Sequence, residues 1–265
     1  MQETGLKRNT IDKFYTSQDA VKFCINLFKK NINISKNDLI VEPSAGNGSF
    51  IGEIKKLVDN YYFFDIKPEN KEIMKKDFLE TEKFNFQKKH CLGNPPFGRQ
   101  SSLAIKFIKK ACENYDTVSF ILPKSFKKES MKKYFPVNFH LICEENMPEN
   151  SYLIDDKKYN VETVFQIWIK KNENRILPPI LEPINFKFVK KNENPDLSFR
   201  RVGINAGTIS TEINDKSDQS HYFIKIEGDI NIEKLKEMKF EHGNTVGPKS
   251  IGKQDLIREF NKLLS

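Results

Sequence analysis

The chain has 265 residues, enough for one large domain with a small appendage, and its 38% hydrophobic residues can supply a core. Its net charge of +8 favours a polyanionic partner such as nucleic acid, although a solvated lysine-rich surface gives the same balance. Because no apolar run could span a membrane and residues 1–9 lack a secretory apolar core, we expect a soluble intracellular protein, in cytoplasm or nucleus.

Helices and strands alternate along the first two thirds of the sequence. Ser17 can cap a first helix, and strands are expected near 38–42, 61–65, 73–76, 89–93 and 117–122. The segments between them include predicted helices near 101–114 and 125–134, and two further strands follow at 138–144 and 161–169. This alternation predicts an α/β fold with a doubly wound, mostly parallel sheet of seven strands. No helix fits between the last two strands, so we expect them to form an antiparallel hairpin.

The last third of the chain predicts a linker and a small C-terminal region. Residues 1–170 form the predicted main domain, the segment 171–198 is rich in Pro, Asn and Lys and reads as a linker, and 199–265 is a small α+β region. That region is expected to recognise substrate or to serve as an accessory. Its cationic residues in glycine-flanked segments are candidates for nucleic-acid phosphate contacts, and ordinary surface charge explains them equally well: Arg200, Arg201, Lys249 and Lys253.

The four cysteines are spread widely, at positions 24, 91, 112 and 143. None forms a Cys-x-x-Cys pair, and His90 beside Cys91 stands alone. Free buried thiols are therefore expected rather than zinc ligands or disulfides, and no metal site is predicted.

A loop of small residues follows the buried strand that ends at Glu42. The loop reads Pro43-Ser44-Ala45-Gly46-Asn47-Gly48-Ser49-Phe50, and its glycines permit a tight turn and a close approach to a ligand. It matches neither the dinucleotide pattern G-x-G-x-x-G nor a phosphate-binding loop. A carboxylate at the strand end repels phosphate and attracts a cation, so Glu42 suits a cofactor that carries an ammonium or sulfonium group.

Two more carboxylates follow predicted strands. Asp65 ends an aromatic strand about twenty residues beyond the glycine loop, where an acid would accept hydrogen bonds from ribose hydroxyls, although it could instead cap a helix. Asp77 could bond an adenine amino group while Phe78 covers the ring. Because carboxyl ends of parallel strands share one edge of the sheet, we expect Glu42, Asp65, Asp77 and Asn94 to meet there.

Asn94-Pro95-Pro96-Phe97 is the most informative stretch of the chain. The two prolines fix their backbone φ angles and remove two N–H donors, so nearby carbonyl oxygens are held rigid. A fixed amide oxygen, a fixed carbonyl oxygen and an aromatic face suit a planar base that carries an exocyclic amino group. An ordinary rigid loop, with Phe97 as a core residue, is the simpler alternative.

In their order and content these motifs resemble those of the class I S-adenosylmethionine-dependent methyltransferases that modify adenine N6, in particular the gamma group of DNA adenine methyltransferases. The resemblance covers roughly residues 14–170. It implies a Rossmann-like fold with an antiparallel last strand, S-adenosylmethionine as cofactor, and a catalytic motif at Asn94, Pro95, Pro96 and Phe97. It implies that the cofactor is bound by Phe14, Tyr15, Thr16, Glu42, Pro43, Ser44, Ala45, Gly46, Gly48, Phe50, Asp65, Ile66, Asp77, Phe78 and Asn94.

The resemblance leaves the substrate open. The Glu-Pro-Ser-Ala-Gly loop and the covering motif at 14–16 favour DNA over RNA as the partner, although related RNA adenine enzymes share the Asn-Pro-Pro-Phe tetrapeptide. Methylation of a protein glutamine also uses Asn-Pro-Pro, usually followed by tyrosine. A catalytically idle nucleic-acid-binding subunit is a further alternative, against which the intact tetrapeptide argues.

Overall fold

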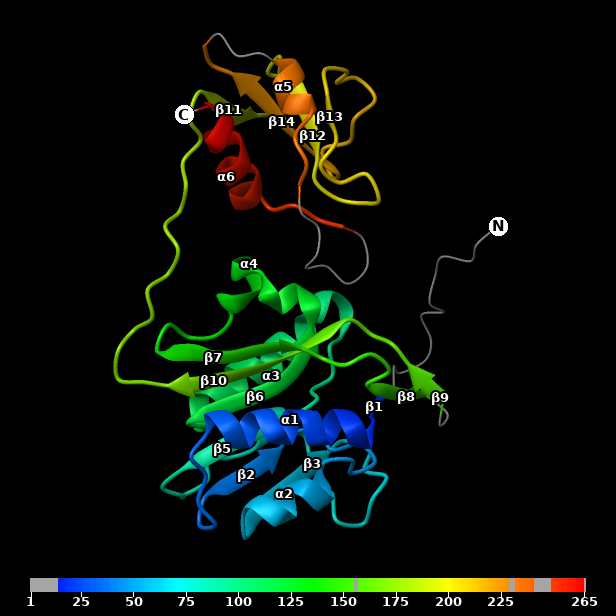
Figure 1. Cartoon of the computed structure of the whole chain (residues 1–265), viewed down its shortest axis with the longest axis vertical. Coiled ribbons are helices and arrows are strands. Elements are labelled where there is room, and N and C mark those ends of the chain that lie inside the picture. Colours follow the sequence, from blue (N-terminus) through cyan, green and yellow to red (C-terminus); the bar gives the residue numbers. More distant parts are fainter. Residues whose placement is uncertain (1–13, 155–156, 229–231, 241–248, 265) are drawn as a thin grey trace. The chain divides into compact units, whose positions relative to one another are not determined.

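The computed structural model describes residues 14–154, 157–228, 232–240 and 249–264. The chain divides into two compact units, Met1–Ile176 and Leu177–Ser265. Unit 1 contains a seven-stranded and a three-stranded sheet, unit 2 contains a four-stranded sheet, and each unit has hydrophobic core clusters of its own (Figure 1).

Unit 1 is built on a seven-stranded sheet. In spatial order its strands are β4 (Met74–Lys75), β3 (Asn60–Asp65), β2 (Leu39–Glu42), β5 (Lys89–Gly93), β6 (Thr117–Pro123), β10 (Thr163–Lys170) and β7 (Phe139–Asn146). The first five pair in parallel, and β10 runs antiparallel to both of its neighbours. The predicted mostly parallel, seven-stranded sheet with an antiparallel last strand is confirmed.

Helices cover both faces of this sheet (Figure 1). Helices α1 (Gln18–Asn31) and α2 (Ile51–Leu57) pack on one face, and α3 (Ser102–Asn114) packs on the other. Alternate strand residues therefore enter two cores, as Ile40 and Val41 of β2 do. Burial on both sides explains why the central strands read as continuous apolar runs.

Local signals set several element ends as the sequence predicts. The Ser17 hydroxyl accepts a hydrogen bond from the Ala20 amide at 3.3 Å and so caps α1. The segment near 125–134 is less helical than predicted, because it forms a 3-10 turn, η3 (Lys124–Lys127), and a four-residue helix, α4 (Glu129–Lys132).

A second, three-stranded sheet in unit 1 has no sequence prediction. It joins β1 (Tyr15–Thr16) to the antiparallel pair β8 (Tyr152–Ile154) and β9 (Lys157–Tyr159). Strands β8 and β9 lie in the sequence between β7 and β10. Those two strands pair antiparallel, as predicted, and the segment that connects them carries β8 and β9.

Unit 2 is a four-stranded antiparallel sheet with two helices. Its strands, in spatial order, are β11 (Phe186–Val189), β14 (His221–Ile226), β12 (Leu197–Arg200) and β13 (Ile209–Ser210), and its helices are α5 (Ile232–Lys236) and α6 (Lys253–Leu264). One face of the sheet packs on α6, where Phe260 contacts the rings of Phe186 and Phe199. The strands and helices of unit 2 agree with the predicted small C-terminal α+β region.

The linker is much shorter than the predicted 171–198. Strand β11 and most of β12 fall inside that range and belong to the sheet of unit 2. The Arg175 guanidinium donates to four carbonyl groups of unit 1, whereas Leu181 exchanges hydrogen bonds with the Gln254 side chain of α6. Only 176–180 lies between these anchors, and Ile176 is 97% exposed.

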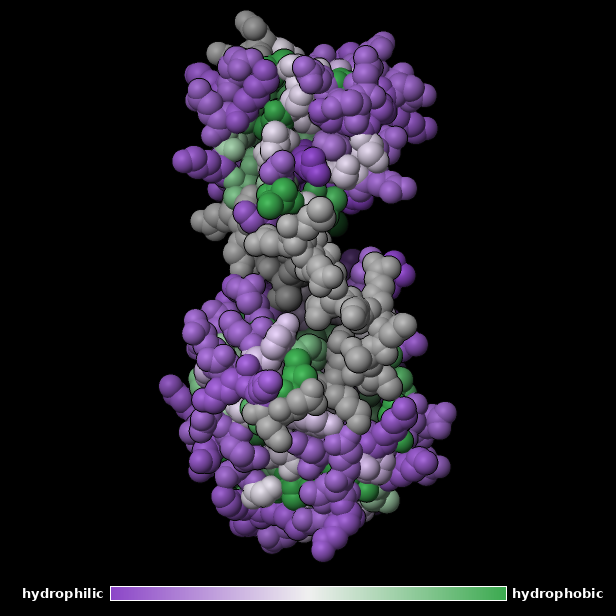
Figure 2. All heavy atoms as spheres, turned by 90° about the vertical axis from the view of Figure 1, so that its right-hand side faces the viewer, coloured by the Kyte–Doolittle hydropathy of each residue, from purple (hydrophilic) through white to green (hydrophobic). Residues whose placement is uncertain are grey.

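The visible surface of both units is mostly hydrophilic (Figure 2). Among the described residues, no helix is both long enough and apolar enough to cross a membrane. All four cysteines are free: three are buried and Cys143 is half-buried.

Candidate active site

The site begins where β2 and β5 end side by side. Glu42, the last residue of β2, is only 2% exposed, and Gly93 ends β5 beside it. A Cβ atom at Gly93 would lie 3.1 Å from Glu42 Cγ and 3.5 Å from Pro43 Cδ. The missing side chain therefore lets the strand that leads into Asn94 pass close against the Glu42 carboxylate.

Asp65 holds the glycine loop against the end of β3. Its Oδ2 atom accepts a hydrogen bond from the Gly46 amide at 2.8 Å, and its Oδ1 atom accepts one from the Lys67 amide at 2.7 Å. Gly46 has a φ of +56°, which an L side chain adopts only with strain. The neighbouring Ile66 is 61% exposed, an apolar surface directly beside the carboxylate.

The segment 14–16 reaches both loops. A Cβ atom at Gly46 would lie 3.6 Å from the Tyr15 ring, so this ring lies over the glycine turn. The Tyr15 hydroxyl donates to Glu69 at 2.6 Å. Phe14 packs against Tyr152 of β8 and Tyr159 of β9, which ties the segment to the inserted strands.

Asn94 is hydrogen-bonded both to the segment 14–16 and to the glycine loop. Its side-chain nitrogen donates to Thr16 Oγ1 at 3.3 Å, and its backbone oxygen accepts from the Ser44 hydroxyl at 2.9 Å. Its side-chain oxygen, Oδ1, is buried and has no hydrogen-bond partner. The amide group is therefore oriented by the covering segment, and one acceptor atom is left unused.

The chain is strained just beyond the tetrapeptide. The Phe97 carbonyl accepts from the amides of Leu103 and Ala104, which fixes the start of α3. Between these points Gly98, Gln100 and Ser101 all have positive φ angles. Left-handed residues other than glycine cost free energy, so the contacts at the start of α3 must hold this turn in place.

Glu42 is the most strongly perturbed carboxyl group of the site. Burial raises its pKa to about 8, and the nearby charge of Asp65 adds to the rise. Its Oε2 atom has no hydrogen-bond partner, as is also true of Asn94 Oδ1. Each such buried polar atom costs about 1–3 kcal/mol, which a ligand with positive charge or N–H and O–H donors would recover.

The other predicted cofactor residues fall into two groups. Pro43, Ala45 and Phe50 are buried and shape the glycine loop from within. Phe78 is 1% exposed and stacks on Phe107 at 5.3 Å in the core beneath α3. This burial corrects the prediction that the Phe78 ring covers an adenine.

Asp77 is not linked to the other site residues by any hydrogen bond in the described part of the chain. Its Oδ1 atom accepts from the Leu79 amide at 2.9 Å and caps the 3-10 turn η1 (Phe78–Glu80). It follows β4, the strand at the sheet edge, and the preceding Lys76 amide donates to the Asp65 carbonyl at 3.0 Å. The Asp77 carboxylate is used to cap η1, whereas Glu42 and Asn94 each keep a side-chain oxygen without a partner.

Two features of the site escaped the sequence reasoning, namely Glu69, which holds the covering Tyr15, and the inserted strands β8 and β9. Ser44 was expected to bind the cofactor, and the structure adds that it fixes the backbone of Asn94. Strands β8 and β9 position Phe14, yet they are only three residues long, too short for a clear period-two pattern.

The four cationic residues predicted to contact phosphate lie around the end of β12 in unit 2. Arg201 and Lys253 approach the same ring, that of Tyr222. Arg200 is turned elsewhere, since its Nε atom donates to the Val202 carbonyl at 3.3 Å. Lys249 is exposed, and its carbonyl accepts from the Gly203 amide.

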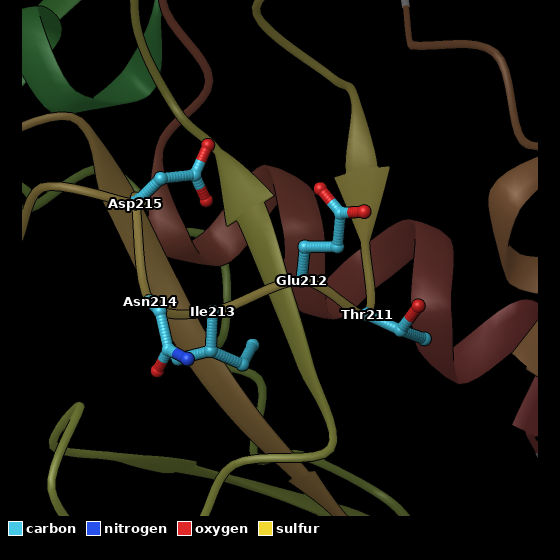
Figure 3. A pocket seen from close by; sticks show the side chains of 5 residues that line it. All are labelled: Thr211, Glu212, Ile213, Asn214 and Asp215. Carbon is cyan, nitrogen blue, oxygen red and sulfur yellow. The ribbon is translucent and has the colours of Figure 1, made fainter.

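Unit 2 also has a hollow formed by the loop 211–215 (Figure 3). Glu212 and Asp215 contribute carboxylates to its lining, and Asp215 pairs with Lys216. This hollow shares no residue with the group around Asn94 and carries none of the predicted chemistry.

No family model matches the chain, and no curated protein sequence matches it. Among solved structures it is similar to a candidate RNA methyltransferase from Pyrococcus horikoshii, with 16% identity, a TM-score of 0.48, and coverage of 63% of this chain and 91% of that one. It is similar to a modification subunit of a candidate type I restriction enzyme from Vibrio vulnificus, with 13% identity, a TM-score of 0.44, and coverage of 60% and 44%.

A third similar structure is the magnesium protoporphyrin IX methyltransferase of Synechocystis with bound S-adenosylmethionine, at 11% identity, a TM-score of 0.42, and coverage of 58% and 79%. At this level of similarity the comparisons bear on neither activity nor substrate. The strand order β4-β3-β2-β5-β6-β10-β7, with β10 reversed, is that of the Rossmann-like fold of class I S-adenosylmethionine-dependent methyltransferases.

Proposed function

We propose that the chain is an S-adenosylmethionine-dependent DNA adenine-N6 methyltransferase. The observation that carries the proposal is Asn94 Oδ1, a buried acceptor without a partner in an amide whose nitrogen is already held by Thr16. The backbone oxygen of Asn94 is likewise occupied, by Ser44. The orphan oxygen is therefore free for a donor that is not part of the chain, and an exocyclic amino group is such a donor.

The residues around Asn94 fit the proposed cofactor. Glu42 offers a buried, unpaired carboxyl group to the positive end of the molecule, and Asp65 offers oxygens to ribose hydroxyls beside the exposed Ile66. Tyr15 would cover the ligand over the glycine turn. When bound, S-adenosylmethionine would supply a sulfonium methyl group open to in-line displacement.

The tetrapeptide would act on the adenine amino group. The lone pair of that nitrogen is delocalised into the ring, and two acceptors on its hydrogens favour a pyramidal, more nucleophilic nitrogen. Asn94 Oδ1 and the Pro95 carbonyl are these acceptors in our proposal, and no hydrogen bond among the described residues ends on the Pro95 carbonyl. Both strengthen as positive charge develops, so they stabilise the transition state more than the ground state.

Phe97 would stack on the extruded base. It is half-buried, so one part of the ring anchors in the core while the rest stays accessible. Stacking of a base on an aromatic side chain contributes roughly 1–3 kcal/mol, which offsets part of the cost of flipping the base out of a duplex. The preference for DNA over RNA rests on the motif resemblance, and the net charge of +8 suits either polyanion.

The test is methyl transfer from labelled S-adenosylmethionine to duplex DNA, single-stranded DNA, RNA and a protein pool, each offered separately. We expect label in DNA, recovered after digestion as N6-methyladenine, and none with the Asn94→Ala variant. Label in RNA alone would replace the DNA substrate by RNA, and label in protein glutamine would overturn the proposal. Nucleic-acid binding without transfer would identify an idle subunit.

A further inference from the structure

Two cationic side chains in unit 2 converge on one pair of aromatic rings. The Arg201 guanidinium lies 5.4 Å from the centre of the Tyr222 ring, and Lys253 Nζ lies 5.8 Å from the same centre. Lys253 Nζ also lies 4.6 Å from the centre of the Phe188 ring. The four residues come from the end of β12 and from β14, β11 and α6, so only the folded unit places them together.

Neither cation has an acidic partner within the described part of the chain. Arg201 donates from one terminal nitrogen to the Gln219 carbonyl at 2.8 Å, while its Nε atom is buried with no partner. Lys253 is exposed and makes no ion pair. Within the described residues, two cations thus share one aromatic ring and neither is paired with a carboxylate.

The start of α6 strengthens this excess of positive charge. Lys253 is the first residue of this twelve-residue helix, where the helix dipole is positive and a cation is disfavoured. Asp255 is the acid of the first turn, but it accepts from the Gly252 amide and pairs with Arg258. A bound anion would offset the repulsion between Lys253 and the positive end of the helix dipole. The preference for acidic residues in the first turn of a helix does not explain a lysine at this position.

The backbone fixes the geometry before any ligand arrives. Val202 and Ser250 form a β-bridge, and the Ile251 amide donates to the Arg201 carbonyl at 2.8 Å. The segment that carries Arg201 is therefore hydrogen-bonded to the segment that leads into Lys253. The rings of Tyr222 and Phe188 hold the two cations by cation–π attraction, which limits the entropy lost when they bind.

We propose that Arg201 and Lys253 form a phosphate-binding site for the sugar–phosphate backbone of a nucleic-acid substrate, a site that rests on the proposed function for the identity of its ligand. Arginine is suited to phosphate because its fork of N–H donors matches the phosphate oxygens, and lysine adds a point charge. Arg200 takes no part, because it points toward the Val202 carbonyl and Gly203. In this proposal unit 2 binds the nucleic-acid strand through its phosphates, independently of the base sequence.

The experiment measures binding of a fluorescent single-stranded oligonucleotide to the full chain over a range of salt concentrations. The test variant is Arg201→Gln/Lys253→Gln. The matched control is Lys234→Gln/Lys239→Gln, which removes the same charge from exposed lysines of the same unit. Each lost phosphate contact lowers the salt slope by about 0.7 for a single strand, so we expect a fall of about 1.4 and an affinity loss of about tenfold at low salt.

The control variant should keep the slope and affinity of the unchanged chain. Equal effects of the two double variants would overturn the site, because the binding would then depend on net charge alone. A test variant that unfolds at a lower temperature is replaced by Arg201→Lys, which keeps the charge but loses the fork and should weaken binding with little change in the salt slope.

A further arm separates this site from other phosphate ligands and from the proposed activity. If inorganic phosphate raises the unfolding temperature of the unchanged chain but no oligonucleotide binds, the backbone ligand is wrong. If the oligonucleotide binds with the expected variant effect but no methyl group is transferred to any nucleic acid, the phosphate site stands and the methyltransferase proposal falls.

Discussion

The two units of this chain carry their candidate sites in different ways. In unit 1 the site consists of short contiguous stretches, 14–16, 42–50, 65–66 and 94–97, most of which directly follow a strand of a parallel sheet. In unit 2 the candidate site consists of single residues that lie in or just after three different strands and at the start of one helix. A parallel sheet collects its strand ends at one edge, so each loop can carry a readable motif. A small antiparallel sheet has no such edge, and its site becomes visible only after folding.

The difference also appears in how charge is arranged. Unit 1 places the carboxyl groups of Glu42 and Asp65 at the ends of β2 and β3, and the unused amide oxygen of Asn94 follows β5, which suits a cation and an amino group. Unit 2 gathers Arg201 and Lys253 on aromatic rings, which suits phosphate. In our proposals a chain with a net charge of +8 thus divides its tasks, chemistry in an acidic site and substrate holding in a basic one.

We expect the largest effect from removing the side-chain amide of Asn94. Asn94→Ala deletes the orphan acceptor, and we expect the rate of methyl transfer to fall by about 10²–10³-fold or more. Binding of S-adenosylmethionine should change little, because Glu42 and Asp65 remain. Kinetics and calorimetric binding on the same preparation check this, and an equal loss of both would contradict the role of Asn94.

The second prediction concerns the burial of Glu42. Its folded-state pKa of about 8 exceeds the ordinary value of 4.5, so the folded state holds a proton that the unfolded state has released. Glu42 therefore lowers the free energy of unfolding, and this destabilisation grows as pH rises from about 4.5 to 8. Below about pH 4.5 the destabilisation is absent. Glu42→Gln should raise the free energy of unfolding by up to a few kcal/mol above about pH 8, and hardly at all near pH 4.5.

Denaturant unfolding of both proteins across this pH range gives the measurement. A stability difference that does not vary with pH would show that Glu42 is not protonated in the folded protein. The same substitution should weaken binding of S-adenosylmethionine above about pH 8, where Glu42 is ionised and attracts a cation that the neutral amide does not.

The third prediction concerns Asp65, which both shapes the loop and faces the proposed ribose. Asp65→Ala removes the acceptor of the Gly46 and Lys67 amides, and two unpaired backbone donors cost about 1–3 kcal/mol each if buried. We expect S-adenosylmethionine affinity to fall roughly 10–100-fold, measured by calorimetry. Asp65→Asn keeps one acceptor oxygen, so its S-adenosylmethionine affinity should lie between those of the unchanged chain and Asp65→Ala. An unchanged dissociation constant for Asp65→Ala would remove this residue from the site.

The smallest expected effect is that of cutting between the units. The segment 176–180 is the only stretch between the anchors at Arg175 and Leu181, and its isoleucines are almost fully exposed. A protease specific for large apolar residues should cleave there first. Because each unit has its own core, the unfolding temperature of each fragment should stay close to its value in the whole chain. Early cleavage inside 186–198 would contradict the assignment of that stretch to unit 2.

Much of the fold of unit 1 could be predicted, and particular residues show why. The run Leu39-Ile40-Val41 is apolar throughout because the strand is buried on both faces. Ser17 caps α1 through a hydrogen bond to an amide only three residues further along the chain. Strands β8 and β9 could not be predicted, because each has only three residues and β8 also pairs with β1, which is distant in sequence. The linker was overestimated because the Pro and Asn residues lie in the segments that flank β11, and this four-residue strand is too short to give a clear pattern of its own.

The amino-acid order by itself determined the parallel sheet, the glycine turn and the Asn94-Pro95-Pro96-Phe97 motif, because local backbone restrictions and apolar periodicity are written in neighbouring residues. Only tertiary packing decided that Phe78 turns inward, that Thr16 and Ser44 leave a single oxygen of Asn94 unused, and that Arg201 and Lys253 approach the same Tyr222 ring. These outcomes join residues that are distant in the chain, and their energies depend on which atoms burial leaves without a partner.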